Sequence, residues 1–194
     1  MRYIALFIAI LIQISALAQD TTSNSVFLGL KSQYGFILPH SKSIRQFSNS
    51  NPYGIEFDFG WVLNNPGDWK RCNCYSRAGF SLSHVNFGNP DVLGSATNLI
   101  MFAEPYLNYK SDIWMTLRMG VGPSYISKVY DKETNPENLF FSNHLSFIIH
   151  LDFMLNFRLN EHWNGKIFGK YNHISNGGVE QPNMGMNFPT VGLG

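Results

Sequence analysis

The sequence predicts an all-β protein, an eight-stranded antiparallel transmembrane β-barrel whose last strand is short or truncated. Three observations predict this fold class. Apolar and polar residues alternate with period two, about eight such segments follow one another, and 14% of the residues are charged while 15% are aromatic. Soluble domains carry roughly 25% charged residues. An apolar outer band with aromatic girdles accounts for this composition better.

The first residues have the pattern of a secretory signal peptide, which we assign to residues 1–18. Arg2 supplies a positive charge, Ile4–Ile14 form an apolar run, and small residues around Ala16 and Ala18 suit cleavage before Gln19. The run is too short to cross a bilayer as a helix. We therefore expect an exported protein in which residues 19–194 form one barrel domain in the outer membrane of a Gram-negative cell.

The expected strands lie near residues 26–36, 53–63, 75–87, 98–109, 113–126, 142–159, 163–175 and 187–194. The second has apolar residues at every other position from Ile55 to Leu63, and the fifth from Ile113 to Val121. The sixth is clearest: one face is Leu145, Phe147, Ile149, Leu151, Phe153, Leu155, Phe157 and Leu159, and the other is polar except for Ile148 and Met154. Such lengths fit the roughly 9 to 11 residues that a tilted strand needs to cross a bilayer.

The connections alternate in length, as in outer-membrane barrels. Those after the first, third, fifth and seventh strands are long, and those after the fourth and sixth are tight turns at residues 110–112 and 160–162. Asn64–Cys74, after the second strand, is longer than this asymmetry predicts. At the far end, the last strand stops at Gly194 without a terminal aromatic residue, which indicates a trimmed strand or a fragment and predicts a weak closing seam.

The interior of an eight-stranded barrel is filled by side chains, which argues against a general porin. Six charged residues fall on inward faces and predict a charge network in the lumen: Glu56, Asp58, Glu104, Arg118, Asp152 and Arg158.

Charge and composition exclude several partners. Without Arg2 the chain has 14 − 1 = 13 basic residues against 13 acidic ones, and no basic cluster indicates nucleic acid.

The histidines lack metal-ligand spacing, so we place His84, His144 and His150 in the lumen or loops, and we expect no metal and no cofactor. Cys72 and Cys74 are expected to lie in a turn without chemistry, a strained or intermolecular disulfide being the alternative.

The seventh strand carries the candidate chemistry. His173 and Ser175 share a face with Trp163, Ile167 and Tyr171, so alternation points both polar side chains toward lipid. Polar groups facing lipid cost desolvation free energy and therefore suggest function. An imidazole beside a hydroxyl is the pair that nucleophilic acyl transfer needs. In the alternative interpretation, the strand ends before His173 and both residues belong to a polar loop.

Residues 173–183, His-Ile-Ser-Asn-Gly-Gly-Val-Glu-Gln-Pro-Asn, closely resemble the signature of PagL-type lipid A 3-O-deacylases. Two further segments resemble the family more loosely, Gly120–Tyr125 and His144–Phe147. The resemblance implies an eight-stranded outer-membrane barrel with a His–Ser site on its outer wall. It also implies an esterase that removes the 3-O-linked acyl chain of lipid A, with lipopolysaccharide as substrate and outer-membrane lipids as surroundings.

By matching position, the resemblance makes Ser175 the nucleophile and His173 its general base. Asn183 corresponds to the family's oxyanion-side asparagine. Asn176 and Gly177 shape the turn that brings backbone N–H groups to the oxyanion, and Phe147 matches a recurrent aromatic.

The sequence departs from the family at Asn187, which stands where an acidic residue usually orients the histidine. Asparagine can hold an imidazole in one tautomer but cannot stabilise the imidazolium by charge. We take Asn187 as the orienting residue, with Glu180 as a possible substitute. Two other functions stay open: a non-enzymatic barrel with a structural or surface-binding role, and a phospholipase-like acyl hydrolase.

Overall fold

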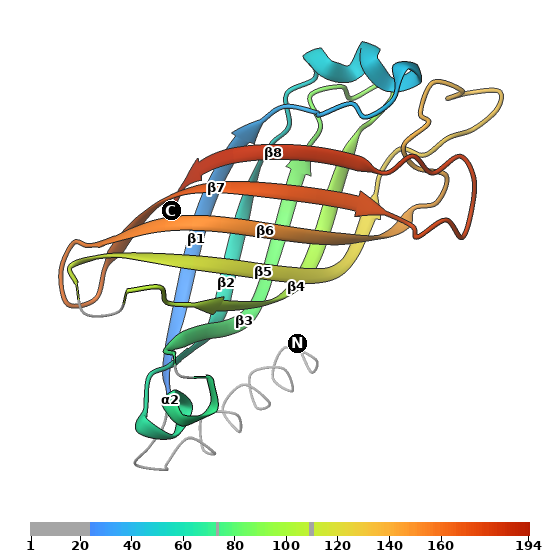
Figure 1. Ribbon diagram of the computed structural model, residues 1–194. Helices are drawn as coiled ribbons and strands as arrows, with labels where there is room; N and C mark the ends of the chain where they lie inside the picture. Colours follow the sequence, from blue (N-terminus) through green and yellow to red (C-terminus); the bar gives the residue numbers. More distant parts are fainter. Residues whose placement is uncertain (1–23, 73, 109–110) are drawn as a thin grey trace, which may run out of the picture.

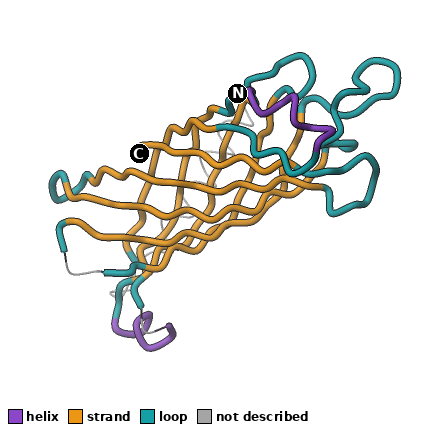
Figure 2. Tube along the Cα trace, turned by 45° about the horizontal axis from the view of Figure 1, so that its top comes forward, coloured by secondary structure: helices purple, strands orange, loops and turns teal. Residues whose placement is uncertain are grey.

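The computed structural model describes residues 24–72, 74–108 and 111–194, and the expected signal peptide lies outside them. Within these ranges, eight antiparallel strands close into a barrel in which each strand pairs with its sequence neighbours and β8 returns to β1 (Figures 1 and 2). The predicted fold class is confirmed. No helix in the described part of the chain is long and apolar enough to cross a membrane.

All the expected strands are present. They are β1 (Ser25–Gly35), β2 (Tyr53–Leu63), β3 (Ser76–Asn86), β4 (Ser95–Pro105), β5 (Ile113–Ile126), β6 (Leu145–Arg158), β7 (Asn164–Ser175) and β8 (Met186–Leu193). Among the described residues, two short helices lie in connections, the 3₁₀ helix η1 (Lys42–Asn49) and the α-helix α2 (Pro66–Cys72). The long loops and η1 gather at one end of the barrel, which we call the loop-rich end (Figure 1).

β4 lies earlier in the sequence than the expected range 98–109, of which residue 109 is not described. Gly94 has a positive φ of 64° and makes the turn from β3, so pairing begins at once with Ser95 opposite Asn86. At the other end, the side-chain oxygen of Asn108 accepts a hydrogen bond of 2.6 Å from the backbone N–H of Met115. This bond replaces a backbone partner and ends the regular ladder.

Burial alternates residue by residue and gives the barrel an apolar outer wall. Along β6, Phe147 is 55% exposed while Ile148 is 2% exposed, and the same change repeats down the strand. The two apolar exceptions to the sequence pattern, Ile148 and Met154, face the interior. Large apolar side chains outside with polar ones inside are typical of a membrane barrel.

The predicted lumen network centres on Arg118, which is fully buried. Its guanidinium lies 2.9 Å from Asp58 Oδ2 and 2.6 Å from Glu104 Oε2. Lys170 Nζ lies 2.5 Å from Glu56 Oε2 and 3.4 Å from Asp152 Oδ2. These opposite charges compensate one another inside the barrel.

Two expectations about polar residues are wrong. Arg158 lies outside the network because it is the last residue of β6; its side chain is 57% exposed and pairs with Asp112 at 3.6 Å. His84 faces outward from β3, where its Nδ1 lies 3.0 Å from the hydroxyl of Thr97. His150 does lie in the lumen, beside Asp152 at 2.5 Å.

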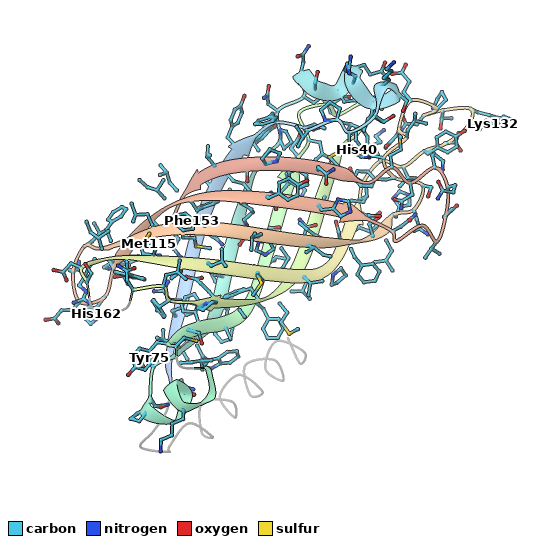
Figure 3. All side chains as sticks on the ribbon, viewed as in Figure 1. His40, Tyr75, Met115, Lys132, Phe153 and His162 are labelled. Atoms are coloured by element: carbon cyan, nitrogen blue, oxygen red, sulfur yellow. The ribbon has the colours of Figure 1, made fainter. Side chains whose placement is uncertain are left out.

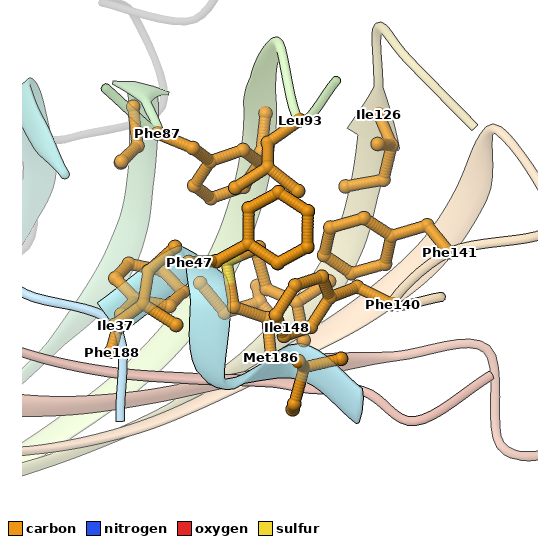
Figure 4. Packing of buried hydrophobic residues seen from close by; sticks show 14 of the residues in the cluster. Ile37, Phe47, Phe87, Leu93, Ile126, Phe140, Phe141, Ile148, Met186 and Phe188 are labelled. Atoms are coloured by element: carbon orange, nitrogen blue, oxygen red, sulfur yellow. The ribbon is translucent and has the colours of Figure 1, made fainter. Parts of the chain in front are cut away.

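An apolar cluster closes the loop-rich end (Figure 4). η1 contributes Ile44 and Phe47, and the connection between β5 and β6 contributes Phe140 and Phe141. The inward side chains at that end of β7 and β8 also belong to it: Ile174, Met186 and Phe188. The strands that carry the candidate site are therefore backed by a packed interior.

The long connection Asn64–Cys74 contains α2. Pro66 occupies its first position, where a missing N–H costs nothing, and the backbone N–H of Asn65 donates to Asp68 Oδ2 at 3.2 Å. Cys74 is disulfide-bonded, so the expectation that both cysteines are without chemistry is wrong.

The closing seam is short, as expected. β1 and β8 pair only from Ser32↔Leu193 to Gly35↔Thr190. The chain beyond β1 then continues along β8. The backbone N–H of Phe36 donates to the backbone carbonyl of Pro189 at 3.2 Å, and that of Leu38 donates to the backbone carbonyl of Asn187 at 2.8 Å. This extension lengthens the seam beside the candidate site.

Candidate active site

His173 and Ser175 both lie on the outward face of β7, at the loop-rich end. Their neighbours Asn172 and Ile174 point inward and are 2% and 0% exposed, whereas His173 and Ser175 are half-buried. The strand continues to Ser175. The alternative in which it ends before His173 is therefore wrong.

The sheet register places two further residues of the predicted site beside this pair. Phe147 on β6 is opposite Ser175, and Asn187 on β8 is opposite His173. Directly opposed side chains on one face of antiparallel strands have Cβ atoms about 5 Å apart. Residues from three strands thus meet at one place on the outer wall.

Two donors converge on the hydroxyl of Ser175. The side-chain amide of Asn183 donates to Ser175 Oγ at 2.9 Å, and the backbone N–H of Gly177 donates to the same oxygen at 3.1 Å. Donors at this position favour negative charge on or near the serine oxygen.

Asn176 builds the turn that aims these donors. Its backbone N–H donates to Asn183 Oδ1 at 3.3 Å, which leaves the NH₂ group of Asn183 pointing at Ser175. Its side chain accepts from the N–H of Gly178 at 2.8 Å and donates to Ser142 Oγ and to the carbonyl of Glu180, both at 3.0 Å. Asn176 therefore acts through the shape of the turn.

The imidazole of His173 is oriented by Asn187. Nδ1 of His173 lies 2.7 Å from Asn187 Oδ1. Because an amide oxygen only accepts hydrogen bonds, Nδ1 carries the proton and Nε2 keeps its lone pair. Glu180 is placed elsewhere, since its carboxylate accepts from Asn143 at 3.1 Å. Asn187, rather than Glu180, is thus the residue that is hydrogen-bonded to His173.

Nδ2 of Asn187, the donor end of the same amide, lies 3.3 Å from Nδ1 of His40. His40 lies in the connection after β1 and was not among the site residues expected from the sequence. Nothing in the local sequence marks it, because the two residues are 147 positions apart.

Gly185 also belongs to the site and was missed from the sequence. Its φ is +67°, and a Cβ there would lie 3.0 Å from His173 Cε1 and 3.4 Å from Ser175 Cβ. The backbone therefore passes directly over both side chains, which only glycine permits without strain.

No hydrogen bond joins Ser175 to His173 among the described residues. The two stand at positions i and i+2 of one strand, about 6 to 7 Å apart along it. Proton transfer from Ser175 to Nε2 of His173 would therefore require a rotamer change of the serine. In the present arrangement, Oγ is held on the donor side by Asn183 and Gly177.

An apolar groove of about 770 Å³ runs along the outer wall and has His173 at one end. It lies between two cross-strand rows of outward side chains. One row is His173, Ile149, Val121, Met101 and Phe80, and the other is Tyr171, Leu151, Met119, Ala103, Ala78 and Trp61. Ala78 and Ala103 have short side chains, so the second row projects less far from the barrel wall at these two positions. This groove has the dimensions and apolarity to hold a hydrocarbon chain.

The described residues offer no cluster of three or more His, Cys, Asp or Glu side chains arranged to hold a metal ion. The site is instead built from a hydroxyl, an imidazole, amides and backbone N–H groups.

A family model described as lipid A 3-O-deacylase (PagL) matches residues 53–194. The chain belongs to this family. The matched range includes every site residue of the PagL resemblance, from Phe147 to Asn187, whereas His40 precedes it. No curated protein matches the sequence.

The barrel is also similar to a solved structure titled "Crystal structure of the outer membrane enzyme PagL". The TM-score is 0.60 and the identity 13%, over 87% of this chain and 97% of that one. At this identity the likeness concerns the fold alone. It agrees with the barrel architecture predicted from the period-two pattern.

Proposed function

We propose that this PagL-family protein is an outer-membrane esterase that removes the 3-O-linked acyl chain of lipid A, with Ser175 as nucleophile and His173 as general base. One observation carries the proposal. Ser175 Oγ faces outward from the barrel and receives two hydrogen-bond donors, while Asn187 leaves the lone pair of the adjacent His173 on Nε2.

In the first step, Ser175 Oγ attacks the ester carbonyl and His173 Nε2 takes its proton. The carbonyl oxygen becomes an oxyanion beside the serine oxygen, within reach of the amide of Asn183 and the N–H of Gly177. Breakdown expels the sugar 3-oxygen, which takes the proton back from His173. An acyl-serine remains.

In the second step, water attacks the acyl-serine while His173 accepts its proton. The free fatty acid leaves, and Ser175 regains its hydrogen from His173. The substrate's acyl chain is expected in the apolar groove that ends at His173, so the barrel wall and the surrounding lipid share its binding. Phe147, exposed opposite Ser175, forms the side of the site toward β6.

The test is mass spectrometry of lipid A from cells that express the wild type or Ser175→Ala. We expect the wild type to release the 3-linked acyl chain and Ser175→Ala to release none, because no other hydroxyl receives these donors. Thr97→Val is the matched control: this outward hydroxyl on β4 lies 3.0 Å from the imidazole of His84 on the neighbouring strand β3. It should leave deacylation unchanged.

The outcomes separate the candidate functions. Intact lipid A from cells with folded wild-type protein would refute the deacylase proposal and favour a structural or surface-binding barrel. Release of fatty acid from glycerophospholipid vesicles instead of lipid A, abolished by Ser175→Ala, would indicate a phospholipase-like hydrolase with the same chemistry.

A further inference from the structure

The strongest unexplained contact lies behind Asn187. His40 comes from the loop between β1 and η1 and ends beside β8 (Figure 3). Its Nδ1 lies 3.3 Å from Asn187 Nδ2, and the opposite end of that amide lies 2.7 Å from His173 Nδ1. Two imidazoles are thus joined through one amide.

The backbone fixes His40 in this place. The loop leaves β1 along the edge of β8, with the N–H of Leu38 donating to the carbonyl of Asn187 itself at 2.8 Å. Ile37 anchors the same segment, because its side chain is 1% exposed within the apolar cluster. The contact between His40 and Asn187 therefore follows from the closing of the barrel.

An asparagine at this position needs such a partner. Its amide has an accepting end and a donating end of nearly equal shape, so it can turn over. A turned amide would present NH₂ to Nδ1 of His173, which would have to become the acceptor and place its proton on Nε2. That tautomer cannot take the proton of Ser175. A carboxylate has two equivalent oxygens and needs no such selection.

We propose that His40 is a positioning residue. Its Nδ1 accepts a hydrogen bond from Nδ2 of Asn187 and thereby keeps the amide oxygen of Asn187 pointed at Nδ1 of His173. This inference rests on the proposed function of Ser175 and His173. It explains how a chain with Asn187 in place of an acidic residue holds the histidine in its basic tautomer.

The test uses the full-length barrel refolded in detergent, with three changes: His40→Leu, His40→Asn and Asn187→Asp. Leucine removes the acceptor, whereas the amide oxygen of asparagine can stand near the place of His40 Nδ1. Three measurements are made: the rate at which a fluorophosphonate labels Ser175, kcat and KM for lipid A, and the ¹⁵N shifts of His173. His173→Gln assigns the ¹⁵N signals.

We expect His40→Leu to slow labelling and to lower kcat by roughly tenfold, the ratio that one hydrogen bond of ordinary strength provides. KM should not change, because His40 does not contact the groove that ends at His173. The ¹⁵N shifts should show loss of the Nδ1–H tautomer. His40→Asn should restore most of the rate and the tautomer.

The decisive comparison is made with Asn187→Asp. In that background His40→Leu should have little effect, because an aspartate needs no orientation. An equal loss of labelling in both backgrounds would show a merely structural role and overturn the inference. So would a wild type with its proton on Nε2 of His173.

Failure of the proposed function looks different. If Ser175 is labelled with the expected dependence on His40 but lipid A stays intact, the substrate is wrong and the positioning role stands. If the wild type is not labelled at Ser175, both are refuted. His84→Leu, at an outward imidazole far from β8 in the strand order, is the control and should change none of these measurements.

Discussion

At the scale of single residues, the site depends on the direction in which amide groups point. Asn183 accepts from Asn176 with its oxygen and therefore donates to Ser175, while Asn187 accepts from His173 and donates to His40. Each amide is held at both ends, so its polarity is fixed before substrate binds. Preorganised dipoles of this kind stabilise developing charge without reorganisation.

We expect Asn183→Leu to lower kcat by about 10² to 10³, the loss found when one oxyanion donor is removed. Leucine has nearly the shape of asparagine but cannot donate to Ser175. The measurement is the rate of acyl release from lipid A micelles. Asn143→Leu, which removes the bonds to the Glu180 carboxylate and to the backbone N–H of Leu145 but none to Ser175, is the matched control. Equal rates for wild type and Asn183→Leu would exclude an oxyanion role.

At the scale of elements, the site is made where the β7–β8 connection folds back over its own strand. Three glycines in this connection have positive φ, Gly177, Gly178 and Gly185. A Cβ at Gly178 would meet nothing within 4 Å, whereas one at Gly185 would press on His173. The connection therefore serves both as a turn and as a cover over the side chains of His173 and Ser175.

This difference gives a paired prediction. Gly185→Ala should slow acyl release far more than Gly178→Ala, although both substitutions strain a left-handed backbone. The additional loss of rate in Gly185→Ala is expected because the added methyl group displaces His173 and Ser175. Rates of lipid A deacylation and of fluorophosphonate labelling measure it. If both variants lose the same activity, backbone strain explains the effect and the contact over His173 has no role.

At the scale of the whole molecule, the barrel combines an apolar wall with a charged interior. Arg118 contacts carboxylates from β2 and β4, and Lys170 links carboxylates of β2 and β6. The pairs with the β2 carboxylates, made by Arg118 on β5 and Lys170 on β7, cross the lumen between strands that are not neighbours in the sheet. The pairs with Glu104 on β4 and Asp152 on β6 join neighbouring strands. Together these pairs fix the cross-section of the barrel, on which the groove and the site are built.

Arg118→Met should destabilise the barrel by about 3 to 5 kcal/mol, because buried carboxylates lose their partner. Arg158→Met should cost about 0 to 1 kcal/mol, since an exposed ion pair contributes little. Unfolding in guanidinium, followed by heat-modifiable migration on gels, gives both free energies. Similar values for the two variants would show that the lumen network does not set stability.

The sequence by itself determined the strands and their faces. Side chains alternate with period two, so residues 145–159 specify both the strand and its lipid side, and the same rule turns His173 and Ser175 outward. The motif from His173 to Asn183 indicated the family. These features are local, since each is carried by neighbours in one strand or one turn.

The tertiary structure decided what closure brings together. His40 meets Asn187 and Arg118 meets Glu56 only because the sheet bends into a ring, and the paired residues lie 147 and 62 positions apart. The place of Gly185 over His173 likewise depends on how the loop returns to β8. Local periodicity carries no information about such contacts, because they are set by the register and curvature of the whole barrel.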